Sequence, residues 1–245
     1  MISATPVKAT CCPQTRLLLF FRGRNRKIEM ESPDKKFSFP VIETERLILR
    51  MFEADDFDSA YLLFSDADVQ KHLSPANRRT QEQMRTTLEK LALRWLERRF
   101  GLWCVCEKNN GKVIGYSGFQ HFEKSSEVEI LFGYLKEFWG NGYATEAAYA
   151  CLRYGFEELS FEKVYAVTHP ENTASQYVLG KLGMSFADRS EHYSMDSITY
   201  VVYRKKFSVK NDFYKLKFTF PKIPAGNPQN ILSRQKSHFA ESIPY

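Results

Sequence analysis

The chain has 245 residues, 43% of them hydrophobic, and a net charge of +6. This length and composition suit one globular domain with a substantial core, and no apolar run approaches the length needed to cross a membrane. The basic charge lies in the two ends. Residues 1–28 hold six Lys or Arg and no acid, and residues 208–245 hold six Lys or Arg and two acids. Residues 29–207 therefore carry a net charge of −4, which argues against a basic surface for nucleic acid on this segment.

We expect the chain to have three parts. Residues 1–40 are predicted to be a basic, disordered extension, residues 41–207 a folded domain, and residues 208–245 a basic tail. An organelle transit peptide has a composition similar to that of the N-terminus, but a disordered extension or an upstream start explains it more simply. Within the tail, residues 213–220 alternate partly and could add an edge strand, dock on a partner or pack loosely.

The cysteines and histidines form no recognisable metal-binding pattern. Cys104 and Cys106 alternate on one face of a strand-like run, so we interpret them as core residues. The other cysteines are Cys11, Cys12 and Cys151. We expect no metal ion and no disulfide framework, which suits a reducing compartment and a cytoplasmic protein. The five histidines fall in unrelated places along the sequence.

The first part of the domain predicts one strand and two helices. Residues 44–51 alternate between polar and apolar side chains, as a half-buried strand does. Apolar residues at helical spacing follow over residues 57–64. A longer apolar stripe predicts a second helix over residues 81–99, with Thr80 as its N-cap.

The second part of the domain predicts an alternation of strands and helices. Asn109-Asn110-Gly111 indicates a hairpin turn between its first two strands. The predicted elements are strands over residues 102–107, 113–119 and 128–134, a helix over 145–159, a strand over 163–168, a helix over 173–182, and strands near residues 186 and 198–205. The whole order, β-α-α-β-β-β-α-β-α-β-β, predicts a mixed α/β fold.

The turn before the first of these later helices carries the clearest functional signal. Residues 139–146 read Trp-Gly-Asn-Gly-Tyr-Ala-Thr-Glu and join a strand to a helix. The first N–H groups of a helix have no intrahelical partner and carry partial positive charge. Gly140 and Gly142 keep side chains away from approaching phosphate oxygens. Because the Walker and three-glycine dinucleotide patterns are both missing, we interpret the turn as another kind of pyrophosphate site; the alternative is a simple turn.

Two motifs in order make the chain resemble the GNAT acyltransferase superfamily. Residues 139–144, Trp-x-x-Gly-x-Ala, are similar to its acyl-CoA loop, Arg/Gln-x-x-Gly-x-Gly/Ala, with Trp at the first position. Downstream, residues 172–175 and 181–184 resemble the family's Asn-x-x-Ser and Lys-Leu-Gly-Phe. The Trp-Gly version of the loop and the strands at residues 43–50 and 114–119 resemble the branch of Rim-type ribosomal-protein N-terminal acetyltransferases.

This resemblance spans residues 41–207 and implies the GNAT fold, a twisted mixed sheet flanked by helices, with acetyl-CoA as the acetyl donor. In the family, the fourth and fifth strands splay apart and the pantetheine arm of CoA enters between them. The residues that the resemblance places on CoA are Leu131, Phe132, Gly133 and Tyr134 on the strand, Trp139, Gly140, Asn141, Gly142, Tyr143, Ala144 and Thr145 in the turn, and Asn172 near the pantetheine arm.

The resemblance also suggests catalytic groups. Glu129 aligns with the glutamate of the branch's Glu-Ile-Gly-Tyr strand and would act as the base, directly or through water. The alternative is that Glu129 is only a solvated charge on the strand. Glu127 is the fallback base. Ser175 resembles the hydroxyl proposed as general acid, although a serine in the first turn of a helix needs no catalytic role. Leu179 stands where many relatives have a tyrosine acid. Glu146 is expected to complement the helix dipole.

The predicted function is transfer of an acetyl group from acetyl-CoA to a primary amine. The branch resemblance favours a protein N-terminal amine as acceptor, and a small-molecule amine is the alternative within the same class. A catalytically quiet module that only binds acyl-CoA is the alternative of a different class. We expect neither a membrane nor a nucleic acid as partner, and the sequence leaves the oligomeric state open.

Overall fold

The computed structural model describes residues 39–72, 80–207 and 215–220. All of them belong to one compact unit, Ser38–Tyr245. The predicted disordered extension therefore lies outside the described residues except for its last two, and most of the predicted tail lies outside them as well. Among the described residues, no helix is both long enough and apolar enough to cross a membrane.

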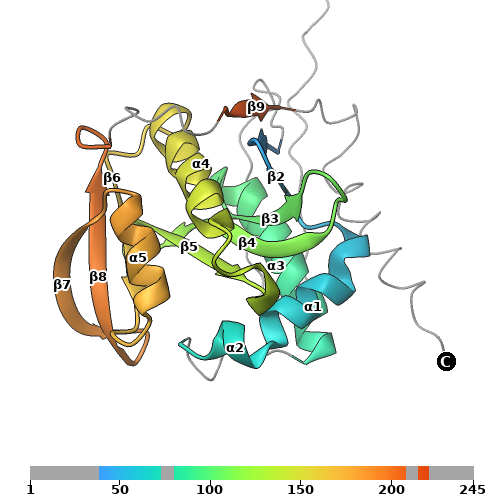
Figure 1. The fold of residues 1–245 in the computed structure, drawn as a ribbon, viewed down its shortest axis with the longest axis horizontal. Helices are drawn as coiled ribbons and strands as arrows, with labels where there is room; N and C mark the ends of the chain where they lie inside the picture. The colour runs from blue at the N-terminus through green and yellow to red at the C-terminus, as the bar shows by residue number, and fades with distance from the viewer. Residues whose placement is uncertain (1–38, 73–79, 208–214, 221–245) are drawn as a thin grey trace, which may run out of the picture. The chain divides into compact units, whose positions relative to one another are not determined.

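The described elements alternate as the sequence predicts, with a few additions (Figure 1). The strands are β1 (Val41–Glu43), β2 (Leu47–Arg50), β3 (Leu102–Glu107), β4 (Val113–His121), β5 (Val128–Tyr134), β6 (Lys163–Thr168), β7 (Ser185–His192), β8 (Met195–Tyr203) and β9 (Lys217–Thr219). The helices are α1 (Phe57–Ser65), α2 (Ala67–Gln70), α3 (Gln81–Arg98), α4 (Tyr143–Glu157) and α5 (Thr173–Lys181), with short 3₁₀ turns at Ala54–Asp56 and Lys136–Phe138.

The described strands form one mixed sheet in the order β7-β8-β6-β5-β4-β3-β2-β1-β9. All neighbouring pairs are antiparallel except β5 and β6, which run parallel. Figure 1 shows α4 and α5 crossing in front of the sheet and α3 behind it. Ala147, Cys151 and Leu152 of α4 lie in one buried cluster, and Met84 and Leu88 of α3 lie in another. The predicted mixed fold with flanking helices is confirmed.

Local signals explain where several elements begin and end. Thr80 caps α3 as predicted, because its side chain accepts from the Gln83 N–H while the Gln83 side chain accepts from the Thr80 N–H. Gly111 takes a left-handed φ of +72° in the predicted β3–β4 hairpin. Cys104 and Cys106 are buried together, with their sulfur atoms 3.8 Å apart, so their prediction as core residues is also confirmed.

Three elements differ from the sequence-based expectations. The strand predicted over residues 44–51 is the shorter β2, and β1 lies before the predicted range. Thr44 turns the chain between them: its N–H donates to the Leu47 carbonyl at 3.0 Å and its hydroxyl accepts from the Leu47 N–H at 2.9 Å. The helix α2 was not predicted. The strand β9 lies in the segment assigned to the tail and pairs with β1, which confirms the edge-strand alternative for that segment.

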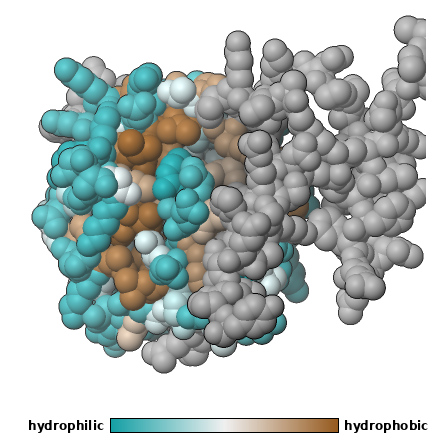
Figure 2. All heavy atoms as spheres, turned by 90° about the vertical axis from the view of Figure 1, so that its right-hand side faces the viewer, coloured by the Kyte–Doolittle hydropathy of each residue, from teal (hydrophilic) through white to brown (hydrophobic). Residues whose placement is uncertain are grey.

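One side of the molecule brings apolar residues to the surface. Figure 2 looks from the right-hand side of Figure 1, where α1 lies, and shows hydrophobic residues gathered there between hydrophilic ones. α1 contributes Leu62, which is 54% exposed, and the partly buried Phe57 and Tyr61. The opposite, buried face of α1 holds Ala60 and Leu63.

Candidate active site

The parallel strands β5 and β6 meet at only one residue pair, Glu129 with Tyr165. Just before that pair, Glu127 and Lys163 form an ion pair at 3.0 Å across the two strands. Beyond it, the described sheet has no further pairing between them, and residues 131–133 of β5 are only partly buried. The backbone of β5 is therefore free on the side of β6, where the resemblance places the pantetheine arm.

The chain leaves β5 through a turn that ends in two left-handed glycines. Gly140 and Gly142 have φ of +78° and +79°, and α4 begins directly afterwards at Tyr143. No side chain caps this helix end. The first N–H to bond within the helix is that of Glu146, which donates to the Gly142 carbonyl at 3.0 Å. Among the described residues the N–H groups just before it have no hydrogen-bond partner within the helix, which is the arrangement that an anion site needs.

Trp139 anchors this turn to the end of β5. Its indole N–H donates to the Tyr134 carbonyl at 2.6 Å, while 47% of the residue stays exposed. The tryptophan in the first position of the loop motif therefore holds the turn against the end of β5, and this contact depends on the indole N–H.

Glu146 lies at the centre of a group of polar contacts beneath the loop. The residue is fully buried and accepts hydrogen bonds from the Thr44 hydroxyl at 2.5 Å and from the Arg46 Nε at 2.7 Å. Arg46 also donates to the Asn141 carbonyl at 3.0 Å and lies 4.6 Å above the ring of Tyr143. Besides the predicted interaction with the helix dipole, the buried Glu146 forms an ion pair with the half-exposed Arg46 that ties the β1–β2 turn to the loop.

The N-terminus of α5 shows how Asn172 and Ser175 are used locally. The Asn172 side-chain oxygen caps the helix by accepting from the Ser175 N–H at 3.1 Å. The Ser175 hydroxyl is partly buried and has no hydrogen-bond partner among the described residues. Leu179 is fully buried, and Tyr177 is 66% exposed beside Lys181, so neither supplies a hydroxyl at the position of the family's tyrosine acid.

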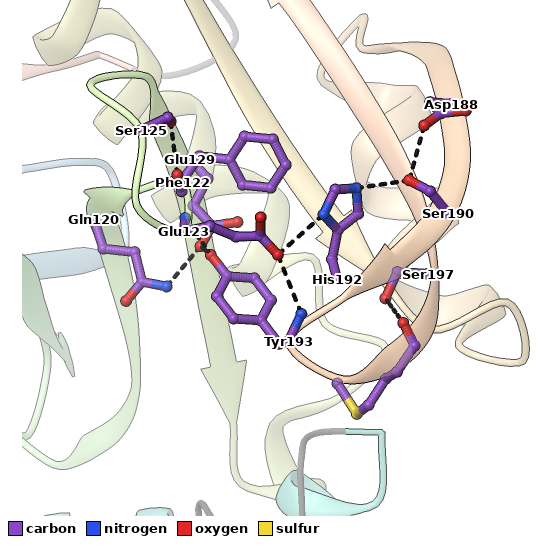
Figure 3. Close-up of polar contacts among 11 residues, drawn as sticks. Gln120, Phe122, Glu123, Ser125, Glu129, Asp188, Ser190, His192, Tyr193 and Ser197 are labelled. Carbon is purple, nitrogen blue, oxygen red and sulfur yellow. Dashed lines mark hydrogen bonds and ion pairs between the residues drawn. The ribbon is translucent and has the colours of Figure 1, made fainter.

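Glu129 is buried at the point where β5 and β6 separate. It is 2% exposed, and its Oε1 accepts from the Gln120 amide at 2.6 Å and from the Tyr193 hydroxyl (Figure 3). Burial raises the pKa of Glu129, and the two hydrogen bonds oppose that rise because they favour the carboxylate. A carboxyl group with a raised pKa is better matched to proton transfer near neutral pH than an exposed one.

The structure also brings together two histidines that look unrelated in the sequence. The rings of His72, after α2, and His169, after β6, lie 5.6 Å apart, and Glu171 is beside them. The ligand atoms of the three residues lie within 4.8 Å of one another, compared with about 3.3 Å in a tetrahedral zinc site. His169 Nδ1 accepts from the Glu171 N–H at 3.2 Å, which holds these two residues together.

The comparisons with known proteins agree with this geometry. A family model described as the acetyltransferase (GNAT) domain matches residues 46–185. The chain belongs to the GNAT acetyltransferase family. It is 31% identical to the uncharacterized N-acetyltransferase YoaA of Bacillus subtilis over 146 residues, which cover 59% of this chain and 82% of YoaA. As a GNAT N-acetyltransferase, the protein is an enzyme that uses acetyl-CoA as the donor and an amine as the acceptor.

Two further matches carry names with specific acceptors. Spermidine N(1)-acetyltransferase of Escherichia coli is 26% identical over 144 residues, which cover 59% of this chain and 75% of that enzyme. The structure of ribosomal-protein-S5-alanine acetyltransferase from Vibrio fischeri matches with a TM-score of 0.58 at 18% identity, covering 69% of this chain and 98% of the other. At that identity the second match shows the shared fold and nothing about the acceptor.

Proposed function

We propose that this enzyme acetylates a primary amine at the separation of β5 and β6, with Glu129 as the base. The observation that carries the proposal is the position of Glu129: a buried carboxylate at the only pairing between the two strands, where the free backbone of β5 begins. A solvated strand charge, which is the alternative interpretation, would not be 2% exposed with two side-chain donors on one oxygen.

The donor would bind along β5 and the glycine turn. The open N–H groups of residues 142–145 suit the pyrophosphate, and Trp139, Gly140 and Asn141 shape the turn that presents them. Residues 131–134 would contact the pantetheine arm, and Asn172 would support it indirectly by ordering the start of α5. Arg46 adds a positive charge beside the turn.

The reaction needs few further groups. The neutral amine attacks the thioester carbonyl carbon, the C–S bond breaks, and the amine proton passes to Glu129 directly or through a water molecule. An N–H near β5 would stabilise the oxyanion. Ser175, whose hydroxyl has no partner among the described residues, would donate its proton to the leaving thiolate and take up a proton from water. Glu129 would release the amine proton to solvent before the next turnover. Holding donor and amine in line would supply much of the remaining rate enhancement.

Two acceptor classes have support of different kinds. The loop and strand motifs resemble the Rim-type branch, which favours a peptide N-terminal amine. The similarity to spermidine N(1)-acetyltransferase favours a polyamine, and the net charge of −4 over residues 29–207 suits a cationic acceptor. A competition assay with a peptide and spermidine at equal concentrations, analysed by mass spectrometry, distinguishes the two.

We place the protein in the cytoplasm because Cys104, Cys106 and Cys151 are free thiols.

The catalytic assignments are tested by pH–rate profiles on the acceptor that the competition identifies. Glu129→Gln should lose most activity near neutral pH and recover partly at high pH, where free amine is abundant. Ser175→Ala should lower turnover at all pH values. Glu127→Gln tests the fallback base and should keep most of the activity, because that carboxylate already pairs with Lys163. Near-normal turnover in both Glu129→Gln and Ser175→Ala means that positioning alone carries the reaction.

A further inference from the structure

The tip of the β7–β8 hairpin reaches across to β5. Tyr193 and Ser194 form the tip, and both have left-handed φ values, +54° and +61°. This conformation is unfavourable for a bulky residue such as tyrosine, and hairpins of this kind usually carry Asn-Gly there. Figure 3 shows the ring of Tyr193 directed at the carboxylate of Glu129. A tyrosine held in an unfavourable conformation points to a requirement for its side chain.

Glu123, in the β4–β5 loop, holds this tip in place. Its carboxylate accepts from the Tyr193 N–H at 3.3 Å and contacts His192 Nδ1 at 3.2 Å (Figure 3). On its other ring nitrogen, His192 meets the Ser190 hydroxyl at 2.9 Å. The loop and the hairpin are therefore joined by several contacts that converge on the residue carrying the phenol.

The hydrogen bonds of the phenol itself fix the direction of its proton. The backbone N–H of Glu123 donates to the Tyr193 oxygen at 3.0 Å, so that oxygen acts as an acceptor on one side. The hydroxyl proton is then free to point at Glu129 Oε1. Burial and the neighbouring carboxylate raise the pKa of Tyr193, so the phenol stays protonated and remains a donor over the working range of an enzyme.

We propose that Tyr193 is a positioning residue for Glu129: together with Gln120 it holds Oε1, so that Oε2 is presented to the proton of the amine. Oε2 has no hydrogen bond among the described residues. This inference rests on the proposed role of Glu129 as the base. It adds that the β7–β8 hairpin, which supplies no residue to the acetyl-CoA loop, sets the ionisation and orientation of that base.

The hydrogen bonds give the expected direction of the effect. The groups that face Glu129 are the neutral Gln120 on β4, Glu123 in the β4–β5 loop, and His192 and Tyr193 on the hairpin. Donors to a carboxylate favour its charged form. Removing the Tyr193 hydroxyl should therefore raise the pKa of Glu129, and because the base must be ionised, the acid limb of kcat/KM should move to higher pH. A lost hydrogen bond to a charged group corresponds to about one pH unit.

The test compares Tyr193→Phe with Tyr203→Phe, the same chemical change at an exposed position on β8. The first readout is the pH profile of kcat/KM with spermidine and with a peptide that has a free N-terminus. The second is the titration of the Glu129 carboxyl by carbon-13 NMR, with Glu129→Gln to assign the signal, which needs no acceptor. Gln120→Leu serves as a second variant, because it removes the other donor to Glu129 Oε1 and leaves the phenol intact.

The inference expects Tyr193→Phe to raise both the acid limb and the Glu129 titration by about one pH unit. The alkaline plateau should stay within about threefold of the wild-type rate. Tyr203→Phe should leave both readouts unchanged, and Gln120→Leu should shift them in the same direction as Tyr193→Phe. If the Glu129 titration does not move in Tyr193→Phe, the inference is refuted. Glu129 remains the base in that case, provided that Glu129→Gln is inactive. If Glu129→Gln is active and the acid limb of its kcat/KM profile is unchanged, Glu129 is not the base, and the inference is refuted as well.

Discussion

Replacing Gly142 with valine tests whether the turn before α4 binds the pyrophosphate of acetyl-CoA. Gly142 has φ of +79°, and a Cβ there would meet only Arg46 Nη2, at the ordinary contact distance of 3.6 Å. The substitution therefore has room, and its cost lies in the backbone. A left-handed conformation costs an ordinary L-residue about 1–2 kcal/mol, and a β-branched residue more.

The exposed turn should release this strain by changing conformation, because Asn141 and Gly142 are both exposed. A relaxed turn no longer directs the N–H groups of residues 143–145 at one point. Hydrogen bonds to a charged group contribute about 1.5–3 kcal/mol each, so the loss of even one weakens binding by about tenfold or more. Titration calorimetry with acetyl-CoA measures the change directly.

A matched control separates this effect from a general cost in stability. Gly111 has φ of +72° in the β3–β4 hairpin, and a Cβ on this residue would have no other atom within 4 Å. Gly111→Val should thus carry the same backbone strain and keep wild-type affinity for acetyl-CoA. If Gly142→Val folds and binds acetyl-CoA as tightly as Gly111→Val, the turn does not hold the pyrophosphate.

Three further predictions concern the fold around the site. Arg46→Ala should lower the free energy of unfolding in urea by about 1–2 kcal/mol, because the buried Glu146 loses its cation but keeps the Thr44 hydroxyl as donor, and water screens the half-exposed Arg46. An unchanged midpoint would contradict this role of Arg46. Wild-type stability should fall as pH rises from 4.5 through the raised pKa of Glu129, because the folded state binds that proton more tightly. Thermal unfolding of Glu129→Gln between about pH 4 and 8 should show no such decline. If stability depends on pH in the same way in the variant and the wild type, Glu129 is not the cause. We also propose that the domain extends through β9. A chain of residues 39–207 should then be less stable than one of residues 39–220 by about 2 kcal/mol. Equal denaturation midpoints would place the domain boundary at residue 207.

Much of the fold follows from local patterns in the sequence. The helix α3 has an apolar stripe and a capping pair, and the strands β3 to β6 have the expected apolar runs between turn signals. The long strand β7 has no such pattern, since most of its residues are exposed at the edge of the sheet. An edge strand with two solvated faces gives no alternation to detect, which is why the sequence predicted a strand near residue 186 but not its length.

The candidate site divides in the same way. The glycine turn is a local feature, so its glycines and the start of α4 could be located from the sequence. Arg46 and Tyr193 were missed because their partners are distant along the chain: Arg46 is 100 residues from Glu146, and Tyr193 is 64 residues from Glu129. His72 and His169 likewise meet only in the folded chain. No short-range pattern marks a residue whose role depends on such contacts.

The central claim is that the buried Glu129 serves acetyl transfer from acetyl-CoA to an amine at the separation of β5 and β6. The most direct measurement incubates the protein with acetyl-CoA and a panel of N-terminal peptides and polyamines, and follows both CoA release and acetylated product. We predict stoichiometric acetyl-CoA binding and turnover of at least one of these amines, with turnover strongly reduced in Glu129→Gln and binding preserved. Tight acetyl-CoA binding without acetylation of any amine would contradict the account and leave a module that only binds acyl-CoA.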